Sequence, residues 1–396
     1  MKIAVVGSGI SGLGAAYALA PTHDVHVLER DRRAGGHAHT VVHDGLALDT
    51  GFLVHNERNY PLLTRLFREL DVETHESDMS FSLSCSGCGL EYSGRQPFAQ
   101  PRNAVRPAFL SLLWEIGRWL RTARPGDESQ SLGDYLDAHG YSQRFRSHFL
   151  VPLTSALWST APGRALEFPA AYAIRFFANH GMLGFGRFRW RTVTGGSRRY
   201  VDAIAARLGD RLRLGENVRS VRRSPDGIEI RVADRVEHFD HVVLATHADQ
   251  ALALLEDATA DERRVLGGFA YTTNEAILHS DSRFLPRTAA ARASWNYRRG
   301  DDGRPTVTYH LNRLQALAAE RDYCVTLNED VPEEHVLERL VYEHPLYTVE
   351  TLRAQDELPR LAGGRTHYAG AYFGNGFHED GLASGVAAAR ALGVAW

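Results

Sequence analysis

Lysine is almost missing from this chain of 396 residues: Lys2 is the only one, and every other side chain with a permanent positive charge is arginine. A site formed by any later segment therefore has no ammonium group to use. Cysteine is also scarce, because the chain has only three, too few for a framework of disulfide bonds. This shortage favours a reducing, cytoplasmic compartment.

Long apolar runs and a strong net charge are missing as well. No run approaches the ~18 apolar residues of a membrane-spanning helix, and the first apolar run is too short for a secretion signal. The 45 basic and 48 acidic residues nearly balance, so the composition does not call for a nucleic-acid partner. With 44% hydrophobic residues, the chain can bury a large core, and its length suggests about two domains.

The first 29 residues carry the strongest motif. A short buried strand, Ile3 to Val6, leads into Gly7-Ser8-Gly9-Ile10-Ser11-Gly12, a helix rich in small residues, and a second strand that ends at Glu29. In this pattern Gly7 permits a tight turn, Gly9 admits a pyrophosphate, and Gly12 lets helix and strand approach. The helix start at Ile10 and Ser11 offers free N–H groups to phosphates. Glu29 is expected to bind the ribose hydroxyls. The motif predicts an α/β, Rossmann-type dinucleotide-binding domain.

The segment after Glu29 resembles the flavin amine oxidase and phytoene desaturase superfamily. The resemblance rests on Arg33-Ala34-Gly35-Gly36-His37 and on Leu48-Asp49-Thr50-Gly51. It implies a glutathione-reductase-like fold and a non-covalent FAD, with further cofactor contacts at Arg30, Gly35, Gly36, His37, Gly51 and Phe52.

Later segments match the same superfamily in the same order. They are Thr194-Gly195-Gly196-Ser197, the strand around Val218, the run His241 to Thr246 with Ala245, and Gly370 followed by Gly381, Leu382 and Ala383. By resemblance, Val218, Ala245, Gly370 and the start of the last helix contact FAD. Because the sequence has one dinucleotide fingerprint, the expected electron acceptor is oxygen, a quinone or another carrier, not NAD(P)H.

The cofactor motifs are spread along the chain, so both domains are predicted to be discontinuous. The FAD-binding domain is assigned to 1–60, 190–250 and 360–396, and a mixed α+β substrate domain to 61–189 and 251–359. Helices are predicted over 60–70, 105–121 and 131–138, and strands over 275–279 and 306–310.

A narrower resemblance points to a substrate. The stretches 51–61, 190–200 and 374–381 look like a bacterial subfamily of FAD oxidoreductases that is associated with cyclopropane-fatty-acid-synthase-like methyltransferases. It implies hydride removal from an apolar, fatty-acyl or lipid substrate, with a methyltransferase as a partner. Two alternatives stay open: an amine or amino-acid oxidase, and a non-catalytic flavin-binding subunit of a lipid methyltransferase.

Three departures weaken the amine oxidase alternative. Many amine oxidases of this superfamily place a lysine against flavin N5, and Lys2 is committed to the first strand. Ala371 follows Gly370 where the family usually has an acid, and His37 replaces a common arginine.

Four residues are candidates for catalysis. His378 and Glu379 directly precede the last helix, where a base or hydrogen-bond donor would face the flavin; the alternative is a polar loop in which Asp380 caps that helix. Tyr297 and His310 lie on predicted strands as pocket walls, although a structural histidine is the better interpretation of His310.

Three other features have two interpretations each. Cys85-Ser86-Gly87-Cys88 is interpreted as a plain hairpin turn, because no second pair completes a metal site, and no metal is expected. The helix 105–121, with arginines around it, either lies on an anionic membrane or packs on the substrate domain, with Val105, Phe109 and Leu112 among its apolar face and Trp114 and Trp119 elsewhere. The cluster Phe176, Phe177, Phe185, Phe188 and Trp190 lines an acyl channel or forms plain core.

Overall fold

The computed structural model describes residues 1–158, 162–184, 188–300, 305–361 and 363–396. The first half of the fold is built on a parallel five-stranded sheet in the order β19-β13-β1-β2-β9. The inner strands are buried runs of Val, Ile and Leu because both faces of the sheet are covered. The strands are β1 Lys2–Val6, β2 Asp24–Glu29, β9 Leu212–Leu214, β13 His241–Leu244 and β19 Thr366–Tyr368.

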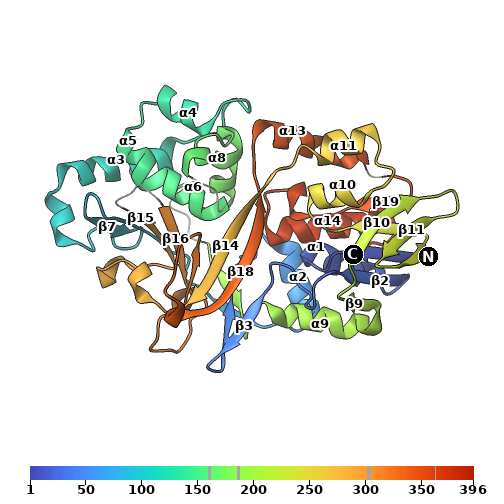
Figure 1. Ribbon diagram of the computed structural model, residues 1–396. Helices are drawn as coiled ribbons and strands as arrows, with labels where there is room; N and C mark the ends of the chain where they lie inside the picture. Colours follow the sequence, from blue (N-terminus) through green and yellow to red (C-terminus); the bar gives the residue numbers. More distant parts are fainter. Residues whose placement is uncertain (159–161, 185–187, 301–304, 362) are drawn as a thin grey trace.

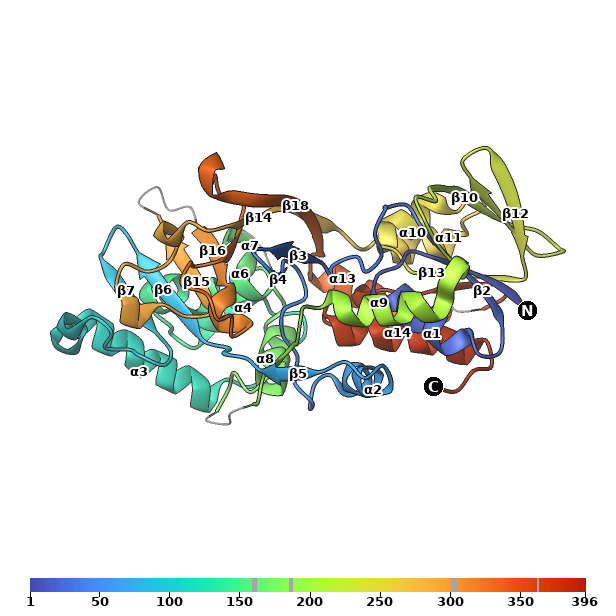
Figure 2. The same cartoon turned by 90° about the horizontal axis from the view of Figure 1, so that it is seen from below.

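Two helices with small residues cover one face of this sheet. They are α1 Ile10–Leu19 and α14 His378–Ala391, and a third helix, α9 Arg198–Leu208, lies on the same face. Figure 2 shows α1 and α14 lying side by side. A Cβ on Gly385 would lie 2.1 Å from the carbonyl oxygen of Ser11, and one on Gly14 would lie 2.4 Å from Leu382. The small residues of α1 therefore serve this helix pair as well as the sheet.

The other face of the parallel sheet carries a second layer. It consists of an antiparallel three-stranded sheet and three helices that share one apolar cluster with β13. Its elements are β10 Val218–Arg223, β11 Ile228–Val232, β12 Arg235–Phe239, α10 Ala248–Leu254, α11 Ala260–Leu266 and α13 Val349–Glu357. The sequence assigned 251–269 and 349–358 to the substrate domain. In the structure, apolar residues of both segments pack on the nucleotide-binding half.

The second half contains a mixed seven-stranded sheet in the order β18-β14-β17-β16-β15-β6-β7. All its pairs are antiparallel except β15 with β6. Figure 1 shows β14 and β18 running from this sheet towards the nucleotide-binding half. The strands are β6 Phe81–Cys85, β7 Leu90–Ser93, β14 Tyr271–His279, β15 Trp295–Arg299, β16 Pro305–His310, β17 Cys324–Leu327 and β18 Val336–Pro345.

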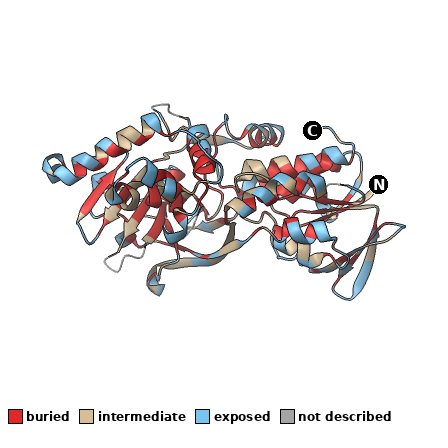
Figure 3. Ribbon diagram, turned by 90° about the horizontal axis from the view of Figure 1, so that it is seen from above, coloured by how far each residue is buried: buried red, intermediate tan, exposed pale blue. Residues whose placement is uncertain are grey.

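Helices pack on this sheet, and two short strand pairs lead towards the other half. The helices are α3 Pro107–Thr122, α4 Leu132–Ala138, α5 Gln143–Phe145, α6 Val151–Trp158, α7 Pro162–Ala165, α8 Ala170–Asn179 and α12 Leu311–Leu314. A π-helical turn, Arg146–Leu150, joins α5 to α6. The strand pairs are β3 Thr40–His43 with β4 Leu46–Asp49, and β5 Thr74–Glu76 with β8 Arg191–Val193. Figure 3 shows buried residues concentrated inside both halves.

Two helices depart from the sequence-based expectations. In α3, Trp119 is buried at 1% exposure, whereas Val105, just before the helix, is 80% exposed. The predicted apolar face is therefore rotated, because four aromatic rings form a pocket for the indole. Helix α2, Pro61–Glu69, contacts α14 and shares the apolar cluster of the nucleotide-binding half. No helix of the described chain is long and apolar enough to cross a membrane.

Candidate functional site

The glycine turn between β1 and α1 has the geometry of a phosphate cradle. Gly7 has a φ of +100°, and a Cβ there would lie 2.6 Å from the carbonyl oxygen of Ala245 on the neighbouring strand. A Cβ on Gly12 would lie 1.9 Å from the carbonyl oxygen of Gly7. At Gly9, in contrast, a Cβ would meet nothing within 4 Å. The turn is thus tight on its inner side and open where a phosphate would approach the N-terminus of α1.

A second glycine loop lies directly on this turn. The backbone N–H of Gly35 donates to the carbonyl oxygen of Ser8 at 3.0 Å, and a Cβ on Gly36 would lie 3.2 Å from the Cα of Gly9. The segment at Gly51 packs just as closely on the segment at His37, because a Cβ on Gly51 would lie 2.2 Å from the carbonyl oxygen of His37. The predicted cofactor segments are therefore stacked on one another at the carboxyl ends of β1 and β2.

Glu29 holds the glycine turn in place. One carboxylate oxygen accepts hydrogen bonds from the N–H of Ser8 at 2.8 Å and from its hydroxyl at 2.6 Å. The other accepts from the N–H of Asp31 at 2.9 Å. The side chain is 9% exposed at the end of β2, where the sequence placed a ribose ligand. The bonds to Ser8 were not foreseen, because only the fold brings the two residues together.

We expect Glu29→Ala to weaken FAD binding by ~1.5–3 kcal/mol, roughly 10- to 150-fold, because the change removes charge-assisted hydrogen bonds and leaves the Ser8 N–H buried without a partner. Equilibrium titration of the apoprotein with FAD, followed by flavin fluorescence, measures the effect. Glu29→Gln, which keeps the shape, should lose less. Unchanged affinity in Glu29→Ala would mean that this acid plays no part in cofactor binding.

The start of α14 reaches the same region with His378. The imidazole stacks on Phe52, with ring centroids 3.9 Å apart, and its Nε2 lies 3.0 Å from the hydroxyl of Tyr200. Burial lowers the pKa of His378 to about 3, so the ring is neutral at pH 7. A neutral, stacked imidazole can donate or accept a hydrogen bond here, but it carries no charge to the site.

Glu379 and Asp380 both accept hydrogen bonds from backbone N–H groups at the starts of helices. The Glu379 carboxylate accepts hydrogen bonds from the N–H groups of Leu62 and Leu63 at the start of α2, at 2.8 and 3.0 Å. Asp380 accepts from the N–H of Phe377 at 2.9 Å and so caps its own helix. The alternative interpretation of this loop, a polar cap, fits the observed bonds.

Three more histidines gather near the cofactor segments. His37 stacks on Tyr342 of β18 at 4.8 Å and meets His344 edge-on at 5.5 Å, while His247 stacks on Tyr271 at 4.4 Å. Burial is the main cause that lowers the pKa of each ring, to about 4 for His344. His247, His344 and Tyr342 carried no motif, so the sequence did not reveal them.

Asp49 joins the two halves behind these loops. Its carboxylate accepts hydrogen bonds from the hydroxyl of Thr40 at 2.5 Å, from the N–H of Ser197 at 2.8 Å and from the side-chain amide of Gln315 at 3.1 Å. Burial raises its pKa to about 6. The close packing around these hydrogen bonds explains why Gly196 must lack a side chain. Its φ is +88°, and a Cβ there would lie 2.5 Å from Thr40.

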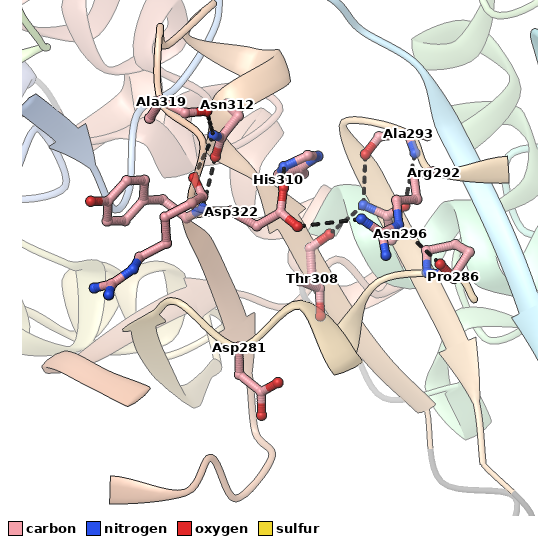
Figure 4. Close-up of polar contacts among 12 residues, drawn as sticks. Asp281, Pro286, Arg292, Ala293, Asn296, Thr308, His310, Asn312, Ala319 and Asp322 are labelled. Atoms are coloured by element: carbon pink, nitrogen blue, oxygen red, sulfur yellow. Dashed lines mark hydrogen bonds and ion pairs between the residues drawn. The ribbon is translucent and has the colours of Figure 1, made fainter. Parts of the chain in front are cut away.

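Tyr297 and His310 do not join this site. Tyr297 is 3% exposed inside β15, which lies between β16 and β6, well away from the strands that approach the nucleotide-binding half (Figure 1). His310 pairs through Nε2 with Asp322 at 2.9 Å, near a network in which Asn296 bonds Ala293 and Thr308 (Figure 4). Both side chains are buried in the substrate half, and the ion pair of His310 fits the structural interpretation of this histidine.

The remaining predicted positions are accounted for as follows. Arg30 is exposed at the end of β2, beside Asp31, and Val218 begins β10. Gly370 donates its N–H to the hydroxyl of Ser384 in α14 at 2.8 Å.

Lys2 lies at the amino end of β1, with its ammonium 4.5 Å from the centre of the Phe239 ring. Since cofactors bind at the carboxyl ends of parallel strands, this lysine is at the wrong end of the sheet to meet a flavin.

The stacked glycine loops, the buried acid after β2 and the attached mixed α+β half define a two-domain dinucleotide-binding oxidoreductase. The model of the family of flavin containing amine oxidoreductases matches residues 10–393, and the chain belongs to this family. Its cofactor is FAD, which supplies two-electron chemistry when bound, and the open face at Gly9 and the start of α1 fit the pyrophosphate of that group.

Known proteins similar to this chain act on different substrates. Amine oxidase [flavin-containing] A of Canis lupus familiaris is 28% identical over 251 residues, which are 58% of this chain and 46% of that protein, so the match spans less than half of the relative. An engineered putrescine oxidase has a TM-score of 0.73 at 16% identity, covering 99% and 98% of the two chains.

Two further solved structures extend the range of substrates. A fatty acid isomerase from P. acnes has a TM-score of 0.69 at 17% identity, covering 98% of each chain. A putative protoporphyrinogen oxidase from Exiguobacterium has a TM-score of 0.72 at 16% identity, again covering 98% of each chain. At these identities the likeness concerns the fold.

Proposed function

We propose that this FAD-dependent oxidoreductase removes hydride from an acyl chain that carries a carboxylate or ester head. The observation that carries the proposal is a pocket of about 490 Å³ between α2 and the β5–β8 pair. Its walls include His55, Phe67, Arg68 and Arg191, with Glu57 as the acid among them. The ring of His55 lies 6.4 Å from that of Phe52, which stacks on His378, so one wall of the pocket is in contact with the cofactor segments.

The polar groups of this pocket suit an anionic head. Arg68 and Arg191 bring two positive charges, and burial lowers the pKa of His55 to about 4, so its imidazole is neutral. Within the described chain, Nδ1 of His55 and the hydroxyl of Thr64 are buried without a hydrogen-bond partner. Buried polar atoms without a partner are costly, and a polar head group that hydrogen-bonds them would offset this cost.

Apolar walls for the acyl chain lie nearby. Phe176 of α8 stacks on Phe377 at the start of α14 with ring centroids 5.0 Å apart, and Tyr172 stacks on Tyr347 at the same distance. Burying each methylene against such rings contributes ~0.8 kcal/mol. Of the phenylalanine cluster predicted as a channel, Phe176 joins this wall, Phe177 is core beside Trp119, and Phe185 lies outside the described residues.

An amine oxidase is the second candidate. The family name, the similar putrescine oxidase and the stacked rings of Tyr172 and Tyr347 favour it. Two arginines at the pocket and the distant Lys2 weigh against it, because a cationic amine is repelled and no ammonium side chain holds a water at the flavin.

We expect anaerobic bleaching of the oxidised flavin by unsaturated or methyl-branched fatty acids or their phospholipids, and none by alkyl amines of equal chain length. Stopped-flow absorbance at the flavin band measures this for each matched pair. Arg68→Gln should raise the KM for the free acid and leave that for its methyl ester nearly unchanged. Rapid bleaching by amines, with no response to any acyl compound, would establish the amine oxidase instead.

We also propose that α3 binds an anionic lipid surface that delivers such substrates. Val105, Leu110 and Trp114 are exposed apolar side chains, at 80%, 43% and 61% exposure. The exposed Arg102, Arg121 and Arg124 flank them. Figure 2 shows α3 at the outer edge of the substrate half. Apolar insertion combined with basic residues is the pattern of interfacial helices.

Sedimentation with vesicles containing phosphatidylglycerol is expected to carry the protein down at low salt and to release it at high salt. Trp114→Ala should weaken binding about tenfold, through loss of ~1.5 kcal/mol of apolar burial. Neutral vesicles are the control. Equal recovery of the protein from anionic and neutral vesicles would contradict the proposal.

A further inference from the structure

The turn between β6 and β7 brings two thiols to one imidazole. Cys85 ends β6, Cys88 follows three residues later, and His148 comes from the π-helical turn before α6. Their three ligand atoms, the two Sγ and Nε2, all lie within 4.8 Å of one another, and Sγ of Cys88 is 3.5 Å from Nε2 of His148. In a tetrahedral zinc site, bonds of about 2.3 Å to sulfur and about 2.05 Å to nitrogen place the bound sulfur and nitrogen atoms roughly 3.5 Å apart. The distance between Sγ of Cys88 and Nε2 of His148 therefore suits a shared zinc ion.

The hydrogen bonds of His148 indicate which tautomer its imidazole adopts, and so which ring nitrogen can bind a metal. The hydroxyl of Ser147 donates to the carbonyl oxygen of Gln143 at 2.8 Å, so it can only accept from Nδ1 of His148, also at 2.8 Å. The proton therefore sits on Nδ1, and the lone pair of Nε2 points to Cys88. Metal-binding histidines are oriented by such a partner on the other nitrogen.

The backbone around the three groups is held from several sides. The hydroxyl of Tyr92 donates to the carbonyl oxygen of His148 at 2.6 Å, and the guanidinium of Arg102 donates to that of Gly89 at 2.7 Å. Cys85 and His148 are buried, while Cys88 is exposed.

We propose that Cys85, Cys88 and His148 bind one Zn²⁺, with a fourth position open to water or an exchangeable ligand on the exposed side of Cys88. Binding displaces the two thiol protons and involves no change of oxidation state. The ion would connect the β6–β7 hairpin to the helical layer through the turn before α6. Its effect is therefore on the stability of the substrate half, not on flavin chemistry.

The test uses the full-length, FAD-bound protein kept reduced, loaded with Zn²⁺ and passed through a desalting column. Elemental analysis is expected to find one zinc per chain in the wild type and in Cys324→Ala, a control at a cysteine buried in β17. Cys88→Ser and His148→Ala should retain none. Ser147→Ala should bind zinc 10- to 100-fold more weakly, because it frees the imidazole.

Two further measurements keep the outcome clear. Co²⁺ in place of Zn²⁺ should give the intense visible bands of tetrahedral thiolate coordination, beyond the flavin absorption. Chelation should lower the unfolding temperature of the wild type and of Cys324→Ala, and leave that of Cys88→Ser and His148→Ala unchanged. Flavin content serves as the check on folding of each variant. Zinc retained equally by Cys88→Ser, or no zinc retained by reduced wild-type protein whose thiols are free, would overturn the proposal.

Discussion

Gly12→Ala is expected to yield protein that has lost its flavin and is destabilised by about 3 kcal/mol or more. The added Cβ would lie 1.9 Å from the carbonyl oxygen of Gly7 and 3.2 Å from the Cβ of Ala245. Backbone cannot give way there, because Gly7 is itself held against β13, so α1 must move from the sheet. The pyrophosphate cradle moves with it. The ratio of flavin to protein absorbance and the thermal unfolding curve measure the two effects.

Gly163→Ala is the matched control for this substitution. Gly163 is exposed in α7, and a Cβ there would meet nothing within 4 Å. This variant should keep its flavin and unfold within about 0.5 kcal/mol of the wild type. A Gly12→Ala protein that is as yellow and as stable as this control would show that the turn does not require the close approach seen in the structure.

Trp119→Ala is expected to destabilise the protein by about 3–5 kcal/mol, the range for a deleted buried indole. Four aromatic rings surround Trp119, those of Tyr135, Tyr141, Phe145 and Phe177, with centroids 5.7 to 6.4 Å away. The rings come from three helices and the loop after α4, so no single movement can fill the cavity. Denaturant unfolding followed by circular dichroism measures the loss.

Trp114 on the same helix provides the comparison. Trp114 is 61% exposed, with Arg118 over its ring at 5.4 Å, so its replacement by alanine should change the free energy of unfolding by less than about 0.5 kcal/mol. Equal losses in the two variants would mean that α3 is not packed in the orientation described. The pair therefore tests the rotation of α3 separately from its proposed contact with lipid.

The sequence predicted those parts of the fold whose causes are local. Strand β1, the glycine turn and β2 follow one another within 29 residues, and each glycine has a steric reason that can be read from its place in the motif. The sequence also predicted α2, α4, β14 and β16, whose boundaries lie within a few residues of the predicted ranges. FAD as cofactor and membership of the flavin oxidoreductases could likewise be inferred.

The parts that were missed depend on contacts between distant segments. Glu379 looked like a catalytic acid because it precedes a helix, but its partners are backbone groups at positions 62 and 63. His148 lies 60 residues from Cys88, so a single Cys-x-x-Cys could only be interpreted as a turn. Trp119 was placed off the buried face because helical periodicity does not specify which neighbours complete a pocket. No local pattern records any of these pairings.

The elements that surround the glycine turn come from distant parts of the chain, and this affects the order in which the cofactor-binding half can fold. The glycine turn is synthesised well before its neighbours β13 and β19. Helix α14, whose Gly381 and Gly385 lie against Ile10 and Ser11, follows every other element in this chain. Although nascent domains generally fold from the N-terminus, this one cannot close its cofactor site in that way. A translation product that ends before α14 therefore lacks the helix against which the start of α1 packs.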